Sequence, residues 1–222
     1  MMEKSEALPE TLETLRRQLA PAIADAAVFD GWTMDAVRQA AAMADIDTAL
    51  AEFAFRDGQM AMIAAWVSHV DEQMERTAPA ASLAGVSIRE RIRRLVMARL
   101  DAVAGREEAL NRALTIMAMP QNLRTSLRLG WHSADAMWRL AGDTATDYNH
   151  YTKRTILGGI YAATLRVFAS DKSEDKAETR AFLDRRIEGI IRFEKTKAQF
   201  LRAPEERISL VRLLGRLRYP AR

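Results

Sequence analysis

The sequence contains no cysteine. Disulfides, thiolate metal sites and cysteine nucleophiles are therefore excluded. Glycine and proline are also scarce, with 10 and 6 among 222 residues, and no stretch alternates apolar and polar residues for long enough to suggest a sheet. No apolar run approaches the roughly 20 residues that a membrane-spanning helix needs. These absences predict a helical protein without a membrane-spanning segment.

What the sequence does contain is apolar periodicity at helical spacing. Hydrophobic residues make up 49% of the chain and charged residues 28%, which is enough for a sizeable core beneath a polar surface. We expect an all-α fold of about ten helices. The main segments are 9–28, 33–44, 47–53, 59–76, 87–100, 106–119, 127–141, 147–168, 174–201 and a last helix after Pro204. We divide the chain into a helical domain, 1–201, and a linker with a basic amphipathic helix, 202–222.

A capping box opens one of the central helices. Ser87 can accept a hydrogen bond from the amide of Glu90, while Glu90 reaches back to the amide of Ser87. Beyond it, Ile92, Leu95, Val96 and Leu100 recur on one helical face. We expect the arginines of this helix to lie on the opposite, exposed face.

The last helix carries most of the positive charge. From Lys195 onward there are eight cations and two acids, so this tail is +6, and the formal charge of +3 leaves −3 for the rest. An apolar stripe formed by Leu210, Leu213, Leu214 and Leu217 faces away from Arg212 and Arg216. This pattern is typical of a helix in a membrane interface. The alternative is a helix docked on its own domain or on a second subunit.

Catalytic motifs are missing. The sequence has no phosphate-binding loop, no dinucleotide-binding glycine turn and no nucleophile elbow. It has three histidines, and none belongs to the Glu-x-x-His pair of a helical di-iron site. We expect no enzyme activity, no metal site and no cofactor, and we assign His132 with Asp135 and Asp147 with His150 to caps and surface hydrogen bonds.

The first three predicted helices have the layout of a TetR-type helix-turn-helix. DNA binding requires cations that neutralise phosphates. Between Arg38 and Arg56 there is no cation, whereas Asp45, Asp47 and Glu52 occupy the turn and the recognition helix. We therefore expect no nucleic-acid binding.

The segment 141–154, AGDTATDYNHYTKR, resembles the signature of the ninth Coq protein family, the accessory proteins of ubiquinone biosynthesis. The resemblance extends to Phe29–Thr33, to the turn at 119–122 and to Arg180–Arg186, and so covers most of the chain in order. It implies a TetR-like homodimeric fold that has lost DNA binding and holds a lipid in an apolar cavity. The family is thought to present isoprenoid quinone intermediates to the demethoxyubiquinone hydroxylase at a membrane.

The resemblance also implies a surface for the hydroxylase. By matching position it includes Met137, Asp147, His150, Tyr151 and Arg154. Mitochondrial members carry tryptophan where this chain has His150, which replaces a typical interface anchor with a weaker one. A plain helix cap is the alternative role for Asp147.

Cavity-lining candidates come from the predicted helices 127–141 and 147–168. They are Trp131, Trp138, Leu157, Ile160 and Tyr161, with ordinary core packing as the alternative. Gly158, Gly159, Ala162 and Ala163 would let a neighbouring helix or a ligand approach the backbone closely.

The acidic start of the chain fits neither a transit peptide nor a secretory signal. We expect a cytoplasmic protein on the inner face of a bacterial inner membrane. The competing functions are a ligand-responsive transcription regulator of the TetR type and a purely structural bundle.

Overall fold

The computed structural model describes residues 11–144 and 148–202, with side chains placed for 11–144 and 150–189. The secondary structure in these ranges is helical, as predicted. The α-helices are α1 (Leu12–Asp30), α2 (Met34–Met43), α3 (Thr48–Ala54), α4 (Gln59–Thr77), α5 (Ile88–Val103), α6 (Glu107–Met117), α7 (Leu123–Leu140), α8 (Tyr148–Ser170) and α9 (Ala177–Arg202), with short 3₁₀ turns at Ala80–Leu83, Pro120–Asn122 and Glu174–Lys176. The predicted tail helix lies outside the described residues.

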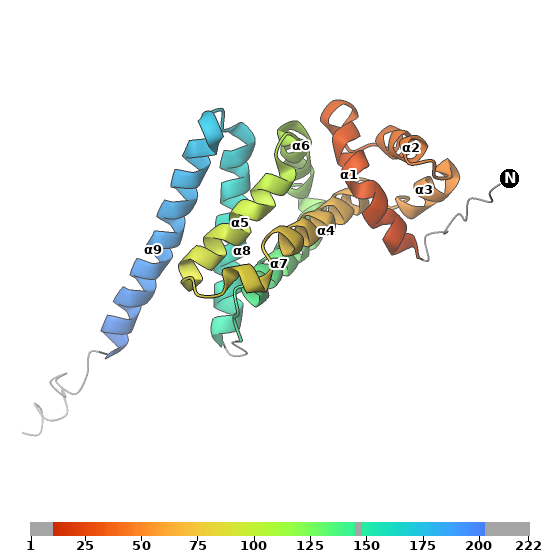
Figure 1. Cartoon of the computed structure of the whole chain (residues 1–222). Helices are drawn as coiled ribbons and strands as arrows, with labels where there is room; N and C mark the ends of the chain where they lie inside the picture. Colours follow the sequence, from red (N-terminus) through yellow and green to blue (C-terminus); the bar gives the residue numbers. More distant parts are fainter. Residues whose placement is uncertain (1–10, 145–147, 203–222) are drawn as a thin grey trace, which may run out of the picture. The chain divides into compact units, whose positions relative to one another are not determined.

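The chain divides into two units after Leu183, and the core and cavity belong to the first. In that unit α1 packs against α2, α4 and α6, while α4 to α8 pack on one another. Figure 1 shows α1, α2 and α3 grouped beyond one end of α4, next to the bundle of longer helices. The boundary predicted at residue 201 falls in the last turn of α9.

Local capping signals set the ends of the first helices. The Thr33 hydroxyl accepts from the amide of Ala36, as predicted, and Asp47 caps α3 through the amide of Ala49. The first helix begins later than predicted because Thr11 caps it through the amide of Thr14. It continues through Asp30 because the left-handed residue is Gly31, with φ of +71°, a conformation that glycine adopts without strain.

Trp32 joins the first three helices to the bundle. Its side chain is 1% exposed, its indole Nε1 donates to the carbonyl of Ala109 at 3.0 Å, and its ring centroid lies 5.2 Å from that of Trp66. Because an indole N–H needs an acceptor when it is buried, this bond fixes α1 and α2 against α6.

Helix α5 shows one half of the predicted capping box. Ser87 accepts from the amide of Glu90 at 3.3 Å, but the Glu90 carboxylate accepts from Nε of Arg94 instead of turning back to Ser87. The expected separation of apolar and basic faces is wrong at one position, because Arg99 is 1% exposed. It follows Ile92 and Val96 at helical spacing and therefore lies on the buried face.

The turn between α8 and α9 is organised by Asp171, which is 5% exposed. Its carboxylate accepts from the amide and hydroxyl of Ser173 at 2.8 and 2.5 Å and from the amide and hydroxyl of Thr179 at 2.8 and 2.6 Å. Burial alone would raise the pKa of Asp171, but these hydrogen bonds outweigh burial and hold it far below its ordinary value. The ionised carboxylate thus anchors the start of α9.

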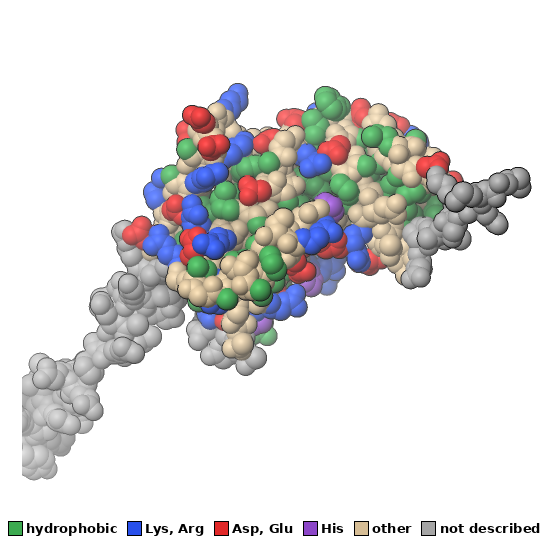
Figure 2. All heavy atoms as spheres, in the orientation of Figure 1, with side chains coloured by type: hydrophobic (Ala, Val, Ile, Leu, Met, Phe, Trp, Pro, Cys, Tyr) green, Lys and Arg blue, Asp and Glu red, His purple; other side chains and the backbone are tan. Residues whose placement is uncertain are grey.

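The surface of the described residues is mixed in charge. Figure 2 shows lysine and arginine interspersed with aspartate and glutamate on the face in view, with apolar side chains between them. Among the described residues, several charges form ion pairs near the surface, such as Arg17 with Glu72 and Arg106 with Asp25, which contribute little stability. The predicted excess of positive charge begins at Lys195, beyond the residues whose side chains are described.

Candidate functional site

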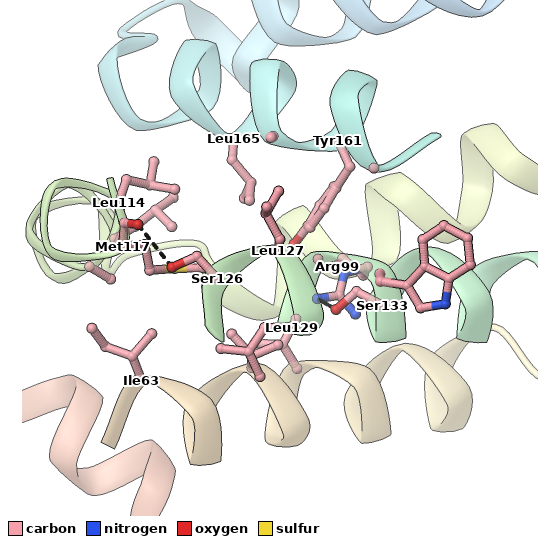
Figure 3. Close-up of a pocket in the computed structure, with 18 of the residues that line it drawn as sticks. Ile63, Arg99, Leu114, Met117, Ser126, Leu127, Leu129, Ser133, Tyr161 and Leu165 are labelled. Carbon is pink, nitrogen blue, oxygen red and sulfur yellow. Dashed lines mark hydrogen bonds between the residues drawn. The ribbon is translucent and has the colours of Figure 1, made fainter. Parts of the chain in front are cut away.

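An apolar cavity of about 610 Å³ lies among α4 to α8. This is within the roughly 300–1,000 Å³ range of small-molecule sites. Figure 3 shows apolar side chains pointing into it from opposite sides, among them Ile63 from α4 and Leu165 from α8. The lining includes Ile63, Trp66, Val67 and Val70 of α4, Val103 of α5, Leu110, Ala113, Leu114 and Met117 of α6, Leu127, Leu129, Gly130 and Trp131 of α7, and Gly158, Gly159, Tyr161, Ala162 and Leu165 of α8.

The cavity reaches the surface between α7 and α8. Leu127 lines it and is also 66% exposed, and Thr155, Gly159 and Ala162 of α8 likewise combine lining with exposure. An exposed leucine beside residues with small side chains makes an apolar entrance. A ligand could therefore enter without unfolding the bundle.

Of the five candidates, Trp131 and Tyr161 line the cavity, whereas Trp138, Leu157 and Ile160 do not. Trp138 turns away from the cavity, because its indole Nε1 donates to the carbonyl of Lys153 at 3.0 Å. Leu157 and Ile160 are 2% and 9% exposed and lie in the core outside the lining. Helical spacing placed these side chains near the interior but could not distinguish core from cavity.

The two central glycines of α8 have different environments. A Cβ on Gly158 would lie 3.9 Å from both the Cβ of Ala134 and the carbonyl oxygen of Gly130, so this residue allows α7 to approach. A Cβ on Gly159 would meet no atom within 4 Å. The two roles considered for this segment therefore belong to adjacent residues. Gly158 allows the neighbouring helix to approach, and Gly159 leaves space for a ligand.

A buried ion pair forms part of the wall. Arg99 Nη1 pairs with Oδ1 of Asp71, and Nη2 donates to the hydroxyl of Ser133 at 3.0 Å. That hydroxyl lies 3.3 Å from Oδ2 of Asp71, to which it donates. The guanidinium carbon lies 4.7 Å from the ring centroid of Tyr161, and Figure 3 shows Arg99, Ser133 and Tyr161 near one another around the cavity. Sequence reasoning missed Arg99, although its spacing from Ile92 and Val96 was a usable signal.

A second buried ion pair network connects the cavity wall to the turn after α7. Arg154, a wall residue, donates through Nε to Asp135 at 2.6 Å and through Nη1 to Asp143 at 3.1 Å. Lys153 also donates to Asp143, at 2.7 Å. Asp143 near the start of the segment 141–154 is therefore joined by ion pairs to Lys153 and Arg154 at its end.

Two of the residues predicted on the partner surface are buried in the structure. Arg154 is 2% exposed and Met137 is fully buried, so the expectation that they lie on an exposed surface is wrong. Arg154 is buried because two carboxylates compensate its charge, and Met137 because it faces the core side of α7. Asp147 lies outside the described residues, as do Leu210, Leu213, Leu214, Leu217, Arg212 and Arg216.

The other two predicted partner residues contact the cavity wall. Tyr151 is 61% exposed, and its ring centroid lies 5.9 Å from that of Trp131 and 5.2 Å from that of His150. The centroids of Trp131 and His150 are 6.3 Å apart. These three rings extend from the cavity wall to the molecular surface.

The α2–α3 pair carries its charge in ion pairs. Arg38 donates to Glu52 at 2.5 Å and also pairs with Asp35. The hydrogen bond and the charge of Glu52 raise the pKa of Arg38. The one cation of α2 is thus held by two carboxylates, one of which belongs to α3.

No group of three or more histidine, aspartate or glutamate side chains in the described ranges could hold a metal ion. No helix in those ranges is long and apolar enough to cross a membrane.

Comparison with known proteins gives both a family and a fold. Residues 123–194 match the family model described as COQ9. The chain is 31% identical over 196 residues to the ubiquinone biosynthesis protein COQ9, mitochondrial, of Rattus norvegicus, an alignment covering 86% of this chain and 63% of the rat protein. The human protein of the same name is 29% identical, with 86% and 62% covered. The chain thus spans a little under two thirds of the length of these curated relatives.

A solved structure has the same fold. It is the TetR transcriptional regulator from Nitrosomonas europaea, with a TM-score of 0.62 and 21% identity over 78% of this chain and 95% of the regulator. The predicted TetR-like all-α fold is therefore confirmed. The family match covers α7, α8 and most of α9, and so includes one side of the cavity.

Proposed function

We propose that the chain, which resembles the COQ9 family in residues 123–194 and the named mitochondrial relatives over most of its length, is a non-catalytic, lipid-binding accessory protein of ubiquinone biosynthesis. It binds an isoprenoid quinone intermediate in the cavity among α4 to α8 and presents it to the demethoxyubiquinone hydroxylase. The names of the relatives support a role in this pathway, and the cavity is the site that we assign to the lipid.

The observation that carries the proposal is the apolar cavity with its entrance between α7 and α8. Its wall is made mainly of aliphatic and aromatic side chains, with five polar residues, Arg99, Ser126, Ser133, Arg154 and Thr155. The Ser126 hydroxyl donates to the carbonyl of Met117. Such a wall favours a ligand that is mostly hydrocarbon. A quinone ring with part of its isoprenoid tail has that character.

Presentation to a partner follows from the position of the three rings. Trp131 faces the cavity, while Tyr151 and His150 contact it from the surface side. A partner that packs on the exposed Tyr151 would lie within a few side chains of the bound ligand. Aromatic residues are frequent interface anchors, so we assign partner contact to Tyr151, His150 and the neighbouring Asp147.

Access to the lipid requires a membrane. We assign this role to the tail helix, with its leucines in the acyl boundary and its arginines at the headgroups. The protein would then act as a homodimer at the inner face of a bacterial inner membrane. Replacing Leu213 and Leu214 with aspartate should abolish binding to anionic liposomes and leave the helical domain folded.

A DNA-binding regulator is the second candidate, because a TetR transcriptional regulator shares the fold. The charge of α2 and α3 argues against it. Arg38 is neutralised by Asp35 and Glu52, and an acidic recognition helix is repelled by phosphates. A gel shift with genomic fragments at low salt tests this candidate, and a sequence-specific shift would favour it.

The proposed function is tested by the turnover of a demethoxyubiquinone hydroxylase on substrate embedded in liposomes. Adding the full chain should increase turnover, and a Tyr151→Ala variant should lose that increase while still extracting quinone from the liposomes. A Thr125→Ala variant on α7 is the matched control. Equal turnover with and without the chain would contradict the proposal.

A further inference from the structure

We propose that Arg99 is the polar anchor of the cavity, and that it donates a hydrogen bond from Nε to a neutral oxygen of the ligand headgroup, such as a quinone or phenol oxygen. This inference rests on the proposed function and deepens it, because it assigns the headgroup end and the chemical class of the ligand.

The burial of Arg99 needs a reason. Its side chain is 2% exposed and borders an otherwise mainly apolar cavity. Removing a cation from water costs several kcal/mol unless it is paired and hydrogen-bonded. Hydrophobic residues of similar volume would fill this part of the core at least as well. A charged side chain that is retained here is therefore a candidate for ligand recognition.

In the described part of the chain, one guanidinium nitrogen of Arg99 takes part in neither an ion pair nor a hydrogen bond. Nη1 forms an ion pair with Asp71 but no hydrogen bond, and Nη2 donates to Ser133. Nε is buried and has no hydrogen-bond partner in the part of the chain that the structure describes. A buried donor without an acceptor costs about 1–3 kcal/mol. An oxygen from a ligand in the cavity would supply the missing acceptor.

The neighbours of Arg99 hold it in place. Asp71 binds one end of the fork, Ser133 links the guanidinium to the same carboxylate, and the Tyr161 ring covers its face at 4.7 Å. A side chain restrained from three sides loses little further freedom when a ligand binds. The guanidinium is thus preorganised before the ligand arrives.

The charge balance of the wall selects for a neutral headgroup. Arg99 is compensated by Asp71, and the other cation of the wall, Arg154, is compensated by Asp135 and Asp143. An anionic phosphate or carboxylate would therefore meet at least as much negative as positive charge, and it would also lose its hydration. A ring carbonyl or phenol needs only a donor, which Nε provides.

The test compares two probes that differ in oxygen. One is a ubiquinone with a decyl tail, and the other is decylbenzene, which has a similar apolar part and no acceptor. Binding to the full-length chain is followed by the fluorescence of Trp66 and Trp131, which both lie in the wall. Arg99→Lys keeps the positive charge for Asp71 but removes Nε–H. Arg124 is an exposed residue of α7, and Arg124→Lys is the matched control.

We expect Arg99→Lys to weaken quinone binding about tenfold, the effect of one hydrogen bond to a charged group, and to change decylbenzene binding less than twofold. The double variant Asp71→Asn/Arg99→Gln, which removes the charges together, should show the same selective loss if the lysine variant is poorly folded. Equal losses for both probes, or unchanged quinone affinity, would overturn the anchor. Tighter binding of decyl phosphate than of the quinone would overturn the preference for a neutral headgroup.

The two proposals fail in different ways. If the unmodified chain binds both probes and the variants bind the quinone equally well, the anchor is wrong and the lipid-binding function stands. If the unmodified chain binds neither probe, both the proposed function and the anchor are wrong.

Discussion

Adjacent glycines in α8 should respond in opposite ways to the same substitution. Gly158 faces α7, where its Cβ would meet atoms of Ala134 and Gly130 at 3.9 Å, and Gly159 faces open space at the cavity entrance. Both are helical, so leucine gains the same helix propensity over glycine at either position, about 0.8 kcal/mol. The comparison of Gly158→Leu with Gly159→Leu therefore isolates the environment of the side chain.

The expected magnitudes follow from the contacts. A single methyl fits at Gly158 at van der Waals distance, but the three further carbons of leucine would push α7 and α8 apart. Overpacking of this kind costs about 1–3 kcal/mol. A Cβ at Gly159 would meet no atom within 4 Å, so we expect this variant to keep the propensity gain. The free energy of unfolding of Gly158→Leu should therefore be lower than that of Gly159→Leu by about 1–3 kcal/mol.

Urea unfolding followed by circular dichroism measures this difference, and binding of an apolar fluorescent probe measures the state of the cavity. Gly159→Leu should be at least as stable as the unmodified chain and bind the probe more weakly, because its side chain narrows the entrance. Gly189→Leu, also helical and without neighbours within 4 Å of its Cβ, is the control for propensity. Equal stability of the two α8 variants, or full probe binding by Gly159→Leu, would refute this description of the cavity.

Three further predictions concern buried polar groups. Asp171→Asn should lower the free energy of unfolding by about 2 kcal/mol at pH 7. The pKa of Asp171 is lower in the folded chain than in the unfolded one, so its contribution to stability is complete above about pH 4 and is lost as the pH falls. Urea unfolding of the unmodified chain and of Asp171→Asn at pH 7 and pH 3 should show a smaller difference in unfolding free energy at pH 3. Arg154→Met should cost about 3–5 kcal/mol, since it leaves the carboxylate of Asp143 buried without that partner, and thermal unfolding would contradict this if the midpoint were unchanged. Trp32→Phe should cost about 1–3 kcal/mol, because it removes the donor to the carbonyl of Ala109, a loss that unfolding in urea would detect.

The local features of the fold could be predicted from the sequence because their causes are local. Thr33 caps α2 through an amide three residues away, and Ser87 does the same for α5. Gly142, with φ of +87°, follows the end of α7 as predicted for a left-handed cap. In each case the helix end and the residue that caps it lie within one helical turn of each other.

The site was harder to predict because its causes are distant in sequence. Arg154 was expected on the surface that meets the partner, and it is buried because Asp135, 19 residues earlier, pairs with it. Trp138 lies on the same helix as Trp131, but its indole N–H donates to the carbonyl of Lys153, and its side chain therefore does not line the cavity. Helical periodicity identifies the inward face of one helix, and it does not identify which neighbouring helix supplies the partner.

The central claim is that the cavity holds a neutral isoprenoid lipid. The most direct test is mass spectrometry of an organic extract from the purified full-length chain, compared with the Gly159→Leu variant purified in the same way. The account predicts a polyprenyl quinone or a related neutral isoprenoid enriched in the unmodified chain and depleted in the variant. A folded protein whose extract contains no such lipid, or the same lipids at the same level in both samples, would contradict it.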